Sequence, residues 1–142
     1  MTRTLVMCKP DAVERRLVGE IVRRLEAKGL RLVAAELRLL DADTAGRLYD
    51  VHKDRPFFYD LIAFVTRSPA MALVVDEAEG GAGGSDDTWQ VVRTLIGATN
   101  PRQAAPGTIR GDLGLETTEN LVHGSDSSEA AAREISILFP DL

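Results

Sequence analysis

The order in which strand and helix patterns alternate along the chain constrains its fold more than any single residue does. A short apolar run at 5–8, stopped by a turn, predicts a buried strand. Apolar residues within 18–25 recur at three- and four-residue spacing, which is typical of an amphipathic helix, and Gly29 follows as its C-cap. Residues 30–40 alternate apolar with polar side chains and slip phase near Ala34, which predicts a long strand with a bulge.

The rest of the chain continues this alternation. We predict helices at 41–52 (capped by Asp41), 57–65, 88–96 and 126–139 (capped by Asp126), and strands at 70–75 and 120–123. The order β-α-β-α-α-β-α-β-α predicts an α+β fold with a ferredoxin-like, four-stranded antiparallel sheet, that is, a βαββαβ core with added helices. The length of 142 residues suits one domain, so we expect residues 1–142 to form a single domain.

Two segments interrupt the pattern. Residues 76–87 read DEAEGGAGGSDD, and we interpret this acidic, glycine-rich stretch as a surface insertion. The alternative is a phosphate-binding loop, which is disfavoured because no Gly-Lys-Ser/Thr follows and because the acids repel phosphate. Residues 100–116 are long for a structureless connection, and such loops are usually functional.

Composition narrows the class of protein. The net charge is −5 and the isoelectric point is about 5.0, which disfavours a nucleic-acid-binding protein. Cys8 is the only cysteine, so no disulfide forms within the chain and we expect a reducing, cytoplasmic setting. The first apolar run is too short for a signal peptide or a membrane span, so we expect no membrane association.

Several cations fall at predicted element ends. Lys9 follows the first strand, Arg93 and Thr99 flank a helix end, and Arg110 lies in a turn rich in proline and glycine. Taken singly, each is more often a surface residue than a ligand. Together they indicate a phosphate site, because phosphate chemistry needs cations that converge on one anion.

His123 is the strongest candidate for chemistry. A histidine after a strand is more often structural, but here Gly124 leaves room beside the ring and the next helix turns its N-terminal amides toward the same region. Imidazole is a good nucleophile at neutral pH once a carboxylate holds its other nitrogen. Glu134 lies about two turns into the last helix and can supply that carboxylate.

Several motifs together resemble the nucleoside diphosphate kinase family, in the correct order and over nearly the whole chain. The motifs are 4–11 (TLVMCKPD), 17–21 (LVGEI), 52–58 (HKDRPFF), 96–101 (IGATNP), 105–112 (APGTIRGD) and 120–126 (NLVHGSD). The resemblance implies an enzyme that moves the γ-phosphoryl group of a nucleoside triphosphate to a nucleoside diphosphate and so maintains triphosphate pools. It also implies ping-pong kinetics through a phosphohistidine.

The resemblance assigns roles position by position. His123 matches the phosphorylated nucleophile, supported by Ser125 and Glu134. Asp126 matches an acid near a magnesium ion that arrives with the nucleotide, and Phe57 matches the aromatic ring that stacks on the base. The residues that match phosphate or ribose contacts are Lys9, Tyr49, His52, Arg93, Thr99, Arg110 and Asn120.

Some features leave alternatives open. A non-catalytic nucleotide-binding module on the same fold is the main rival. The family resemblance implies a homo-oligomer, for which we favour a hexamer, with residues 100–116 at a subunit contact and a tetramer still possible. Glu119 stands where the family often carries a base, and we expect it to weaken nucleotide binding.

Overall fold

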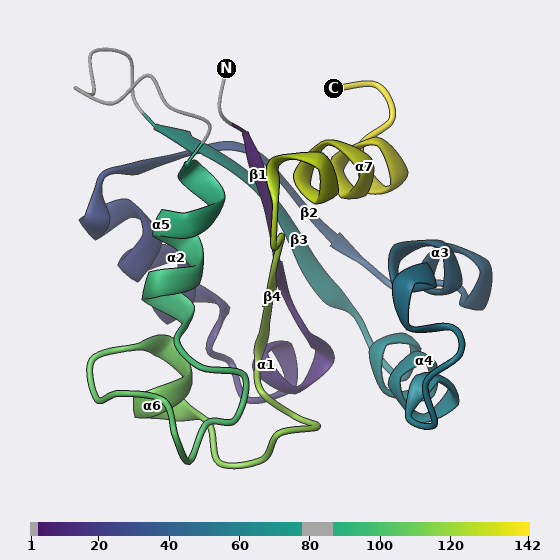
Figure 1. The fold of residues 1–142 in the computed structure, drawn as a ribbon. Coiled ribbons are helices and arrows are strands. Elements are labelled where there is room, and N and C mark those ends of the chain that lie inside the picture. Colours follow the sequence, from purple (N-terminus) through teal and green to yellow (C-terminus); the bar gives the residue numbers. More distant parts are fainter. Residues whose placement is uncertain (1–2, 78–86) are drawn as a thin grey trace.

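A computed structural model describes residues 3–77 and 87–142 (Figure 1). Four strands form one sheet in the order β2-β3-β1-β4, and every neighbouring pair is antiparallel. The strands are β1 (Thr4–Cys8), β2 (Leu30–Arg38), β3 (Ala70–Glu77) and β4 (Val122–Gly124). This order and the intervening helices confirm the predicted α+β, ferredoxin-like fold.

The helices cover both faces of the sheet. They are α1 (Pro10–Glu14), α2 (Val18–Lys28), α3 (Ala42–Leu48), α4 (Phe58–Thr66), α5 (Thr88–Ile96), α6 (Ile109–Leu113) and α7 (Ser128–Leu138), with a 3₁₀ turn η1 (Asp50–His52). Figure 1 shows α2 and α5 on one side of the sheet, and α3, α4 and α7 on the other. Among the described residues, no helix is long and apolar enough to cross a membrane.

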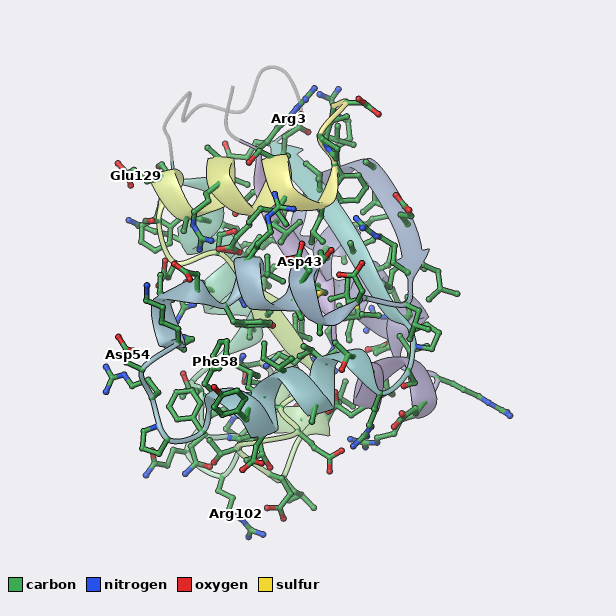
Figure 2. All side chains as sticks on the ribbon, turned by 90° about the vertical axis from the view of Figure 1, so that its right-hand side faces the viewer. Arg3, Asp43, Asp54, Phe58, Arg102 and Glu129 are labelled. Carbon is green, nitrogen blue, oxygen red and sulfur yellow. The ribbon has the colours of Figure 1, made fainter. Side chains whose placement is uncertain are left out.

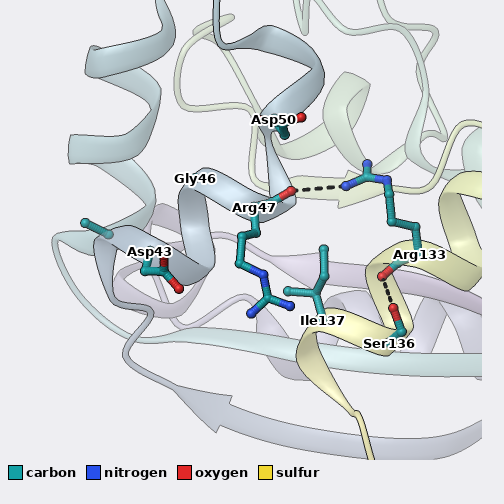
Figure 3. Close-up of a pocket in the computed structure, with 8 residues that line it drawn as sticks. Asp43, Gly46, Arg47, Asp50, Arg133, Ser136 and Ile137 are labelled. Carbon is teal, nitrogen blue, oxygen red and sulfur yellow. Dashed lines mark hydrogen bonds between the residues drawn. The ribbon is translucent and has the colours of Figure 1, made fainter.

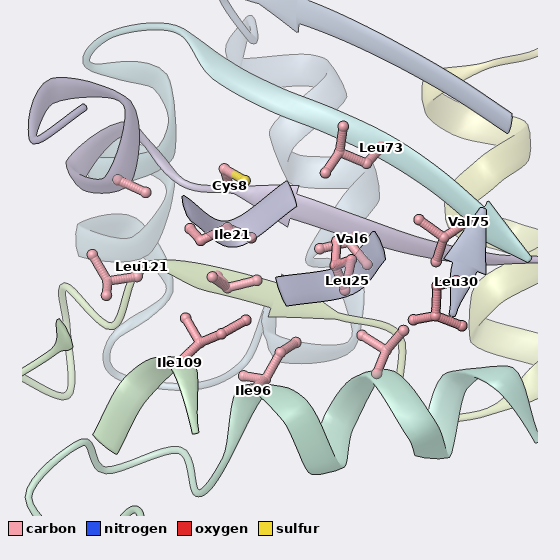
Figure 4. Packing of buried hydrophobic residues seen from close by; sticks show 13 residues of the cluster. Val6, Cys8, Ile21, Leu25, Leu30, Leu73, Val75, Ile96, Ile109 and Leu121 are labelled. Carbon is pink, nitrogen blue, oxygen red and sulfur yellow. The ribbon is translucent and has the colours of Figure 1, made fainter. Parts of the chain in front are cut away.

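Two apolar cores lie on the two faces because successive side chains of a strand point to opposite sides. Val6 and Cys8 of β1 join the core beneath α2 and α5, which also contains Ile109 (Figure 4). Leu5 and Met7 join the core beneath α3, α4 and α7. The side chains of these four β1 residues are fully buried, so β1 lies at the centre of the protein and gives Lys9, the next residue, a rigid support.

Local signals set several element ends as predicted. Gly29 closes α2 with φ of 108°, a left-handed conformation that glycine adopts without steric cost. Asp41 caps α3 by accepting a hydrogen bond from the Thr44 backbone at 2.7 Å. The predicted bulge in β2 falls between Leu32 and Ala34. Residues 78–86 of the predicted insertion lie outside the described residues.

Several boundaries differ from the prediction. The strand expected at 120–123 is Val122–Gly124, because only these residues pair with β1. The turn expected after β1 is the start of α1, because Pro10 suits the first helical position. The helix begun at Asp41 ends at Leu48 and continues as η1. The loop 100–116 contains α6, which Thr108 caps. The last helix is capped by Ser127 rather than Asp126, since Ser127 Oγ accepts from the Ala130 backbone at 3.0 Å.

Candidate active site

His123 lies at the middle of β4, the edge strand next to β1. It pairs with Met7 in the antiparallel register, so its side chain is on the face covered by α3, α4 and α7. Its neighbour Gly124 faces the other side, where an added Cβ would lie 2.8 Å from Ile96 Cδ1. Glycine therefore lets α5 pack closely against β4 beside the histidine.

A buried carboxylate holds one nitrogen of the His123 ring. Nε2 is hydrogen-bonded to Oε1 of Glu134, which projects from α7 and is 3% exposed. Ser125 Oγ donates to the same oxygen at 3.2 Å, and Ser125 is itself fully buried. A carboxylate on Nε2 fixes the tautomer in which that nitrogen carries the proton, so Nδ1 keeps its lone pair.

The open edge of β4 positions two arginines. Carbonyls of alternate residues in an edge strand point away from the sheet and need partners. Arg110 donates to the carbonyl oxygens of Asn120 at 3.1 Å and Val122 at 2.6 Å, and Arg93 donates to that of Gly124 at 3.2 Å. The two guanidinium groups therefore lie along the strand that carries the histidine.

A lysine completes the group of cations. Lys9 follows β1 directly, is 8% exposed, and donates from Nζ to Oδ1 of Asn120 at 2.9 Å. Asn120 in turn donates from Nδ2 to the Thr99 carbonyl at 3.0 Å. The first contact joins residues that are 111 positions apart in the sequence.

The cations repel one another. Burial, then the charge of Arg110, lowers the pKa of Lys9 to about 8. Burial, then the charge of Arg93, lowers the pKa of Arg110 to about 10. The charge of Lys9 is disfavoured by Arg110, and that of Arg110 by Arg93, so a bound anion would offset this repulsion.

Aromatic side chains extend the site beyond the histidine. The Tyr49 ring meets the His123 ring edge-on, with centroids 5.6 Å apart. The His52 ring lies against Phe57, with centroids 5.5 Å apart, and Phe57 is 48% exposed. Figure 2 shows Asp54, which lies between His52 and Phe57 in the sequence, and Phe58 on the same side of the molecule as Glu129 at the start of α7. An exposed phenyl ring next to a histidine is suited to stack on a planar group.

The remaining predicted residue, Asp126, follows Ser125 and is exposed to solvent. Among the described residues no group of three or more His, Cys, Asp or Glu could hold a metal ion by itself. A single exposed carboxylate fits magnesium, which keeps several waters and takes its other ligands from phosphate.

Two surface hollows have linings that do not include His123. One of about 570 Å³ lies between α3 and α7, where Arg133 donates to the Arg47 carbonyl at 3.1 Å (Figure 3). The other, of about 260 Å³, is lined by Asp11, Arg67 and Glu119 among others. The lining of the first hollow includes none of the predicted site residues, so the site is defined by its hydrogen bonds and charges.

Sequence patterns assigned no role to Asp11, yet this carboxylate is buried next to Lys9 and accepts from the Leu121 backbone at 3.0 Å. The sequence does place Asp11 two residues after the candidate Lys9, but we interpreted Lys9-Pro10-Asp11 only as a turn. Glu119, whose charge we expected near the nucleotide, is ion-paired with Arg67 at 2.7 Å, and Arg67 also holds Glu14. This pairing offsets the negative charge of Glu119.

The ferredoxin-like sheet, the oriented histidine and the cations along its strand define a phosphotransferase. A family model described as nucleoside diphosphate kinase matches residues 2–142. The chain therefore belongs to the nucleoside diphosphate kinase family, and it transfers phosphoryl groups between nucleotides.

Curated relatives and solved structures agree with this assignment. Nucleoside diphosphate kinase of Thermobifida fusca is 49% identical over 142 residues, which cover all of this chain and 99% of the relative. That of Mycolicibacterium gilvum is 52% identical over 141 residues, covering 99% and 98%. The structure of a halophilic nucleoside diphosphate kinase from Halobacterium salinarum in complex with CDP matches with a TM-score of 0.89 at 45% identity, covering 98% of this chain and 88% of that one.

Proposed function

We propose that His123 carries the phosphoryl group, and that it accepts the γ-phosphoryl of a nucleoside triphosphate on Nδ1 and passes it to a nucleoside diphosphate. The hydrogen bond from Nε2 to Glu134 carries this proposal, because it occupies the other ring nitrogen. Such a carrier makes the reaction ping-pong, since one site binds donor and acceptor in turn. The result is the exchange that maintains nucleoside triphosphate pools.

The transfer needs no proton donor. The lone pair of Nδ1 forms the bond to phosphorus, and the bond from phosphorus to the bridging oxygen of the leaving diphosphate breaks. The ring keeps its proton on Nε2 and becomes positively charged, and the Glu134 carboxylate stabilises that charge. The second half-reaction is the reverse, with a different diphosphate as the nucleophile.

The cations stabilise the transferring phosphate. Lys9, Arg93 and Arg110 hold the phosphate oxygens, while Asn120 and Thr99 contact phosphate or ribose. Because phosphoryl transfer is mostly positioning and charge stabilisation, a prearranged set of cations supplies most of the catalysis. Their mutual repulsion in the free protein supports an anion-binding role.

Magnesium arrives with the nucleotide in this proposal. Asp126 is the side chain that would contact the ion, through its water shell, and the ion would neutralise charge on the phosphates. One exposed carboxylate suits an ion that is held mainly by the nucleotide, rather than one that is held by protein ligands alone.

Phe57 stacks on the base in this proposal; its ring contacts His52, and the ring of Tyr49 contacts His123. We predict that Phe57→Ala raises KM for nucleotides about tenfold and changes kcat little, because stacking contributes about 1–3 kcal/mol per base. Steady-state kinetics with purine and pyrimidine diphosphates measure this. Tyr59→Ala is the matched control, since Tyr59 is a nearby aromatic residue that is 82% exposed and has no proposed role. Equal KM values for Phe57→Ala and the original protein would contradict stacking.

Labelling separates the enzyme from a non-catalytic nucleotide-binding module. Incubation with ATP labelled at the γ-phosphate, without acceptor, is expected to leave about one labelled phosphate per chain, as a covalent intermediate requires. The label is expected to be lost in acid, to survive in alkali, and to move onto added diphosphate. A binding module stays unlabelled.

We also propose that residues 1–142 form one domain, that the protein acts in the cytoplasm, and that it assembles as a homo-oligomer, with a hexamer favoured over a tetramer. Residues 100–116 are the segment that we place at a subunit contact. Light scattering on the purified protein distinguishes these assemblies by mass. We expect no nucleic-acid partner, given the net charge of −5.

A further inference from the structure

Asp11 is a buried carboxylate whose position folding alone does not explain. It is 5% exposed, and burial raises its pKa above the ordinary value for aspartate. Oδ2 accepts from the Leu121 backbone at 3.0 Å, but Oδ1 has no hydrogen-bond partner within residues 3–77 and 87–142. A buried carboxylate with an unsatisfied oxygen opposes folding at neutral pH. We therefore looked for a role of Asp11 in the active site.

The backbone that Asp11 holds is unusual. Leu121 has φ of 74°, in the left-handed region that residues with a side chain rarely adopt. It is held from both sides, because its N–H donates to Asp11 and its carbonyl accepts from the Lys9 backbone at 2.8 Å. Strained conformations of this kind persist where the surroundings enforce them, and they cluster at functional sites.

The left-handed residue separates two site residues. Asn120, immediately before it, directs its amide toward Lys9 and Thr99. His123, two residues after it, lies within β4 and faces Glu134. The hydrogen bond from Leu121 to Asp11 therefore fixes the angle at which the chain passes from one residue to the other.

Asp11 also acts on the charge of Lys9. Burial and Arg110 favour the neutral amine, and Asp11 opposes them by raising the pKa of Lys9. The other titratable groups around this pair are Arg110 on α6, which Arg93 on α5 repels, and the buried thiol of Cys8 on β1. Of the two charged groups in the described residues that shift the pKa of Lys9, Arg110 and Asp11, only Asp11 is negative.

We propose that Asp11 is a positioning residue for phosphoryl transfer, which holds Leu121 in the left-handed conformation that aims Asn120 and His123 and which provides the negative charge beside Lys9. The inference rests on the proposed roles of Lys9 and His123. Asp11 itself touches no substrate, and it acts through these neighbours.

Two substitutions separate the hydrogen bond from the charge. Asp11→Asn keeps an oxygen that accepts from Leu121 but removes the negative charge, whereas Asp11→Ala removes both. Lys9 must be protonated to bind phosphate, so kcat/KM falls as the pH rises through its pKa in the free enzyme. In Asp11→Asn this alkaline fall is expected at lower pH, while kcat/KM at about pH 6.5 stays within roughly threefold of the original protein.

For Asp11→Ala we expect kcat/KM to fall at least about tenfold at every pH, because the buried Leu121 N–H loses its acceptor. Glu14→Gln is the matched control: it removes one negative charge from the same helix at a half-exposed position, and its pH profile is expected to superimpose on that of the original protein. Thermal denaturation of each variant shows whether it is folded.

An Asp11→Asn profile with an unshifted alkaline limb overturns the charge role, even if Asp11→Ala does not fold. Full activity of a folded Asp11→Ala overturns the positioning role. The labelling experiment on the original protein is run alongside: if that protein forms no acid-labile phosphoenzyme, the proposed function is wrong, whereas a labelled original protein with unaffected Asp11 variants contradicts this inference alone.

Discussion

His123→Ala is expected to form no phosphoenzyme and to lose transfer activity by about 10⁴-fold or more, the size of effect seen when a covalent nucleophile is removed. The reason is chemical, because the ring supplies the nucleophilic nitrogen of the proposed mechanism, and Glu134 holds its other nitrogen. Nucleotide affinity is expected to change by only a few fold, since Lys9, Arg93 and Arg110 remain. Labelling with γ-labelled ATP and equilibrium binding of ADP measure the two quantities separately.

His52→Ala is the comparison variant, because it removes the other histidine of the chain. As a residue proposed to contact the nucleotide it is expected to raise KM, but it is still expected to form the phosphoenzyme. The substitution at His123 leaves Glu134 with one fewer partner, so thermal denaturation must accompany the kinetics. Transfer by a folded His123→Ala variant within tenfold of the original rate would show that another group carries the phosphate.

Lys9→Met is expected to lower kcat/KM by about 10²–10³, the usual cost of removing one preorganised group that stabilises developing charge. The same change is expected to stabilise the free protein at pH 7 by about 1–3 kcal/mol, because the folded state disfavours the charge of a lysine whose pKa burial lowers to about 8. A variant that is more stable but less active would show that the charge of Lys9 serves catalysis and not folding.

The stability of the protein is expected to depend on pH through Lys9. The unfolded chain holds the Lys9 proton up to its ordinary pKa of 10.5, whereas the folded chain releases it near 8. Between these values the unfolded state binds more protons, so the stability of the original protein rises with pH, and this rise is expected to be missing in Lys9→Met. Chemical denaturation across that pH range measures this rise, and Lys28→Met, at an exposed site on α2, is the control.

A Lys9→Met protein that is fully active would refute the catalytic role of the Lys9 charge.

Sequence patterns predicted the fold well where one local signal dominated. The apolar spacing of α2, its closing Gly29 and the bulge in β2 are all determined by nearby residues, and the structure has them as expected. The cap of α7 was misplaced by one residue, because Asp126 and Ser127 are both good capping residues and periodicity does not choose between them. The helix α6 was missed, since its Pro-Gly approach indicated a turn.

The residues of the candidate site could be proposed from the sequence more readily than the contacts that position them. The contact from His123 to Glu134 spans eleven positions, within reach of a sequence argument. The binding of Arg110 and Arg93 to the open edge of β4 depends on the order of strands in the sheet, which no local pattern specifies. The pairing of Glu119 with Arg67, 52 positions away, was likewise invisible before the chain was folded.

The proposed mechanism depends most directly on which nitrogen of His123 carries the phosphate. The measurement is nuclear magnetic resonance of the phosphoenzyme, prepared from protein with isotopically labelled histidine and kept in alkali. Because Glu134 occupies Nε2, we predict a phosphate bonded to Nδ1 of His123. A phosphate on Nε2, or on any residue other than His123, would contradict the mechanism.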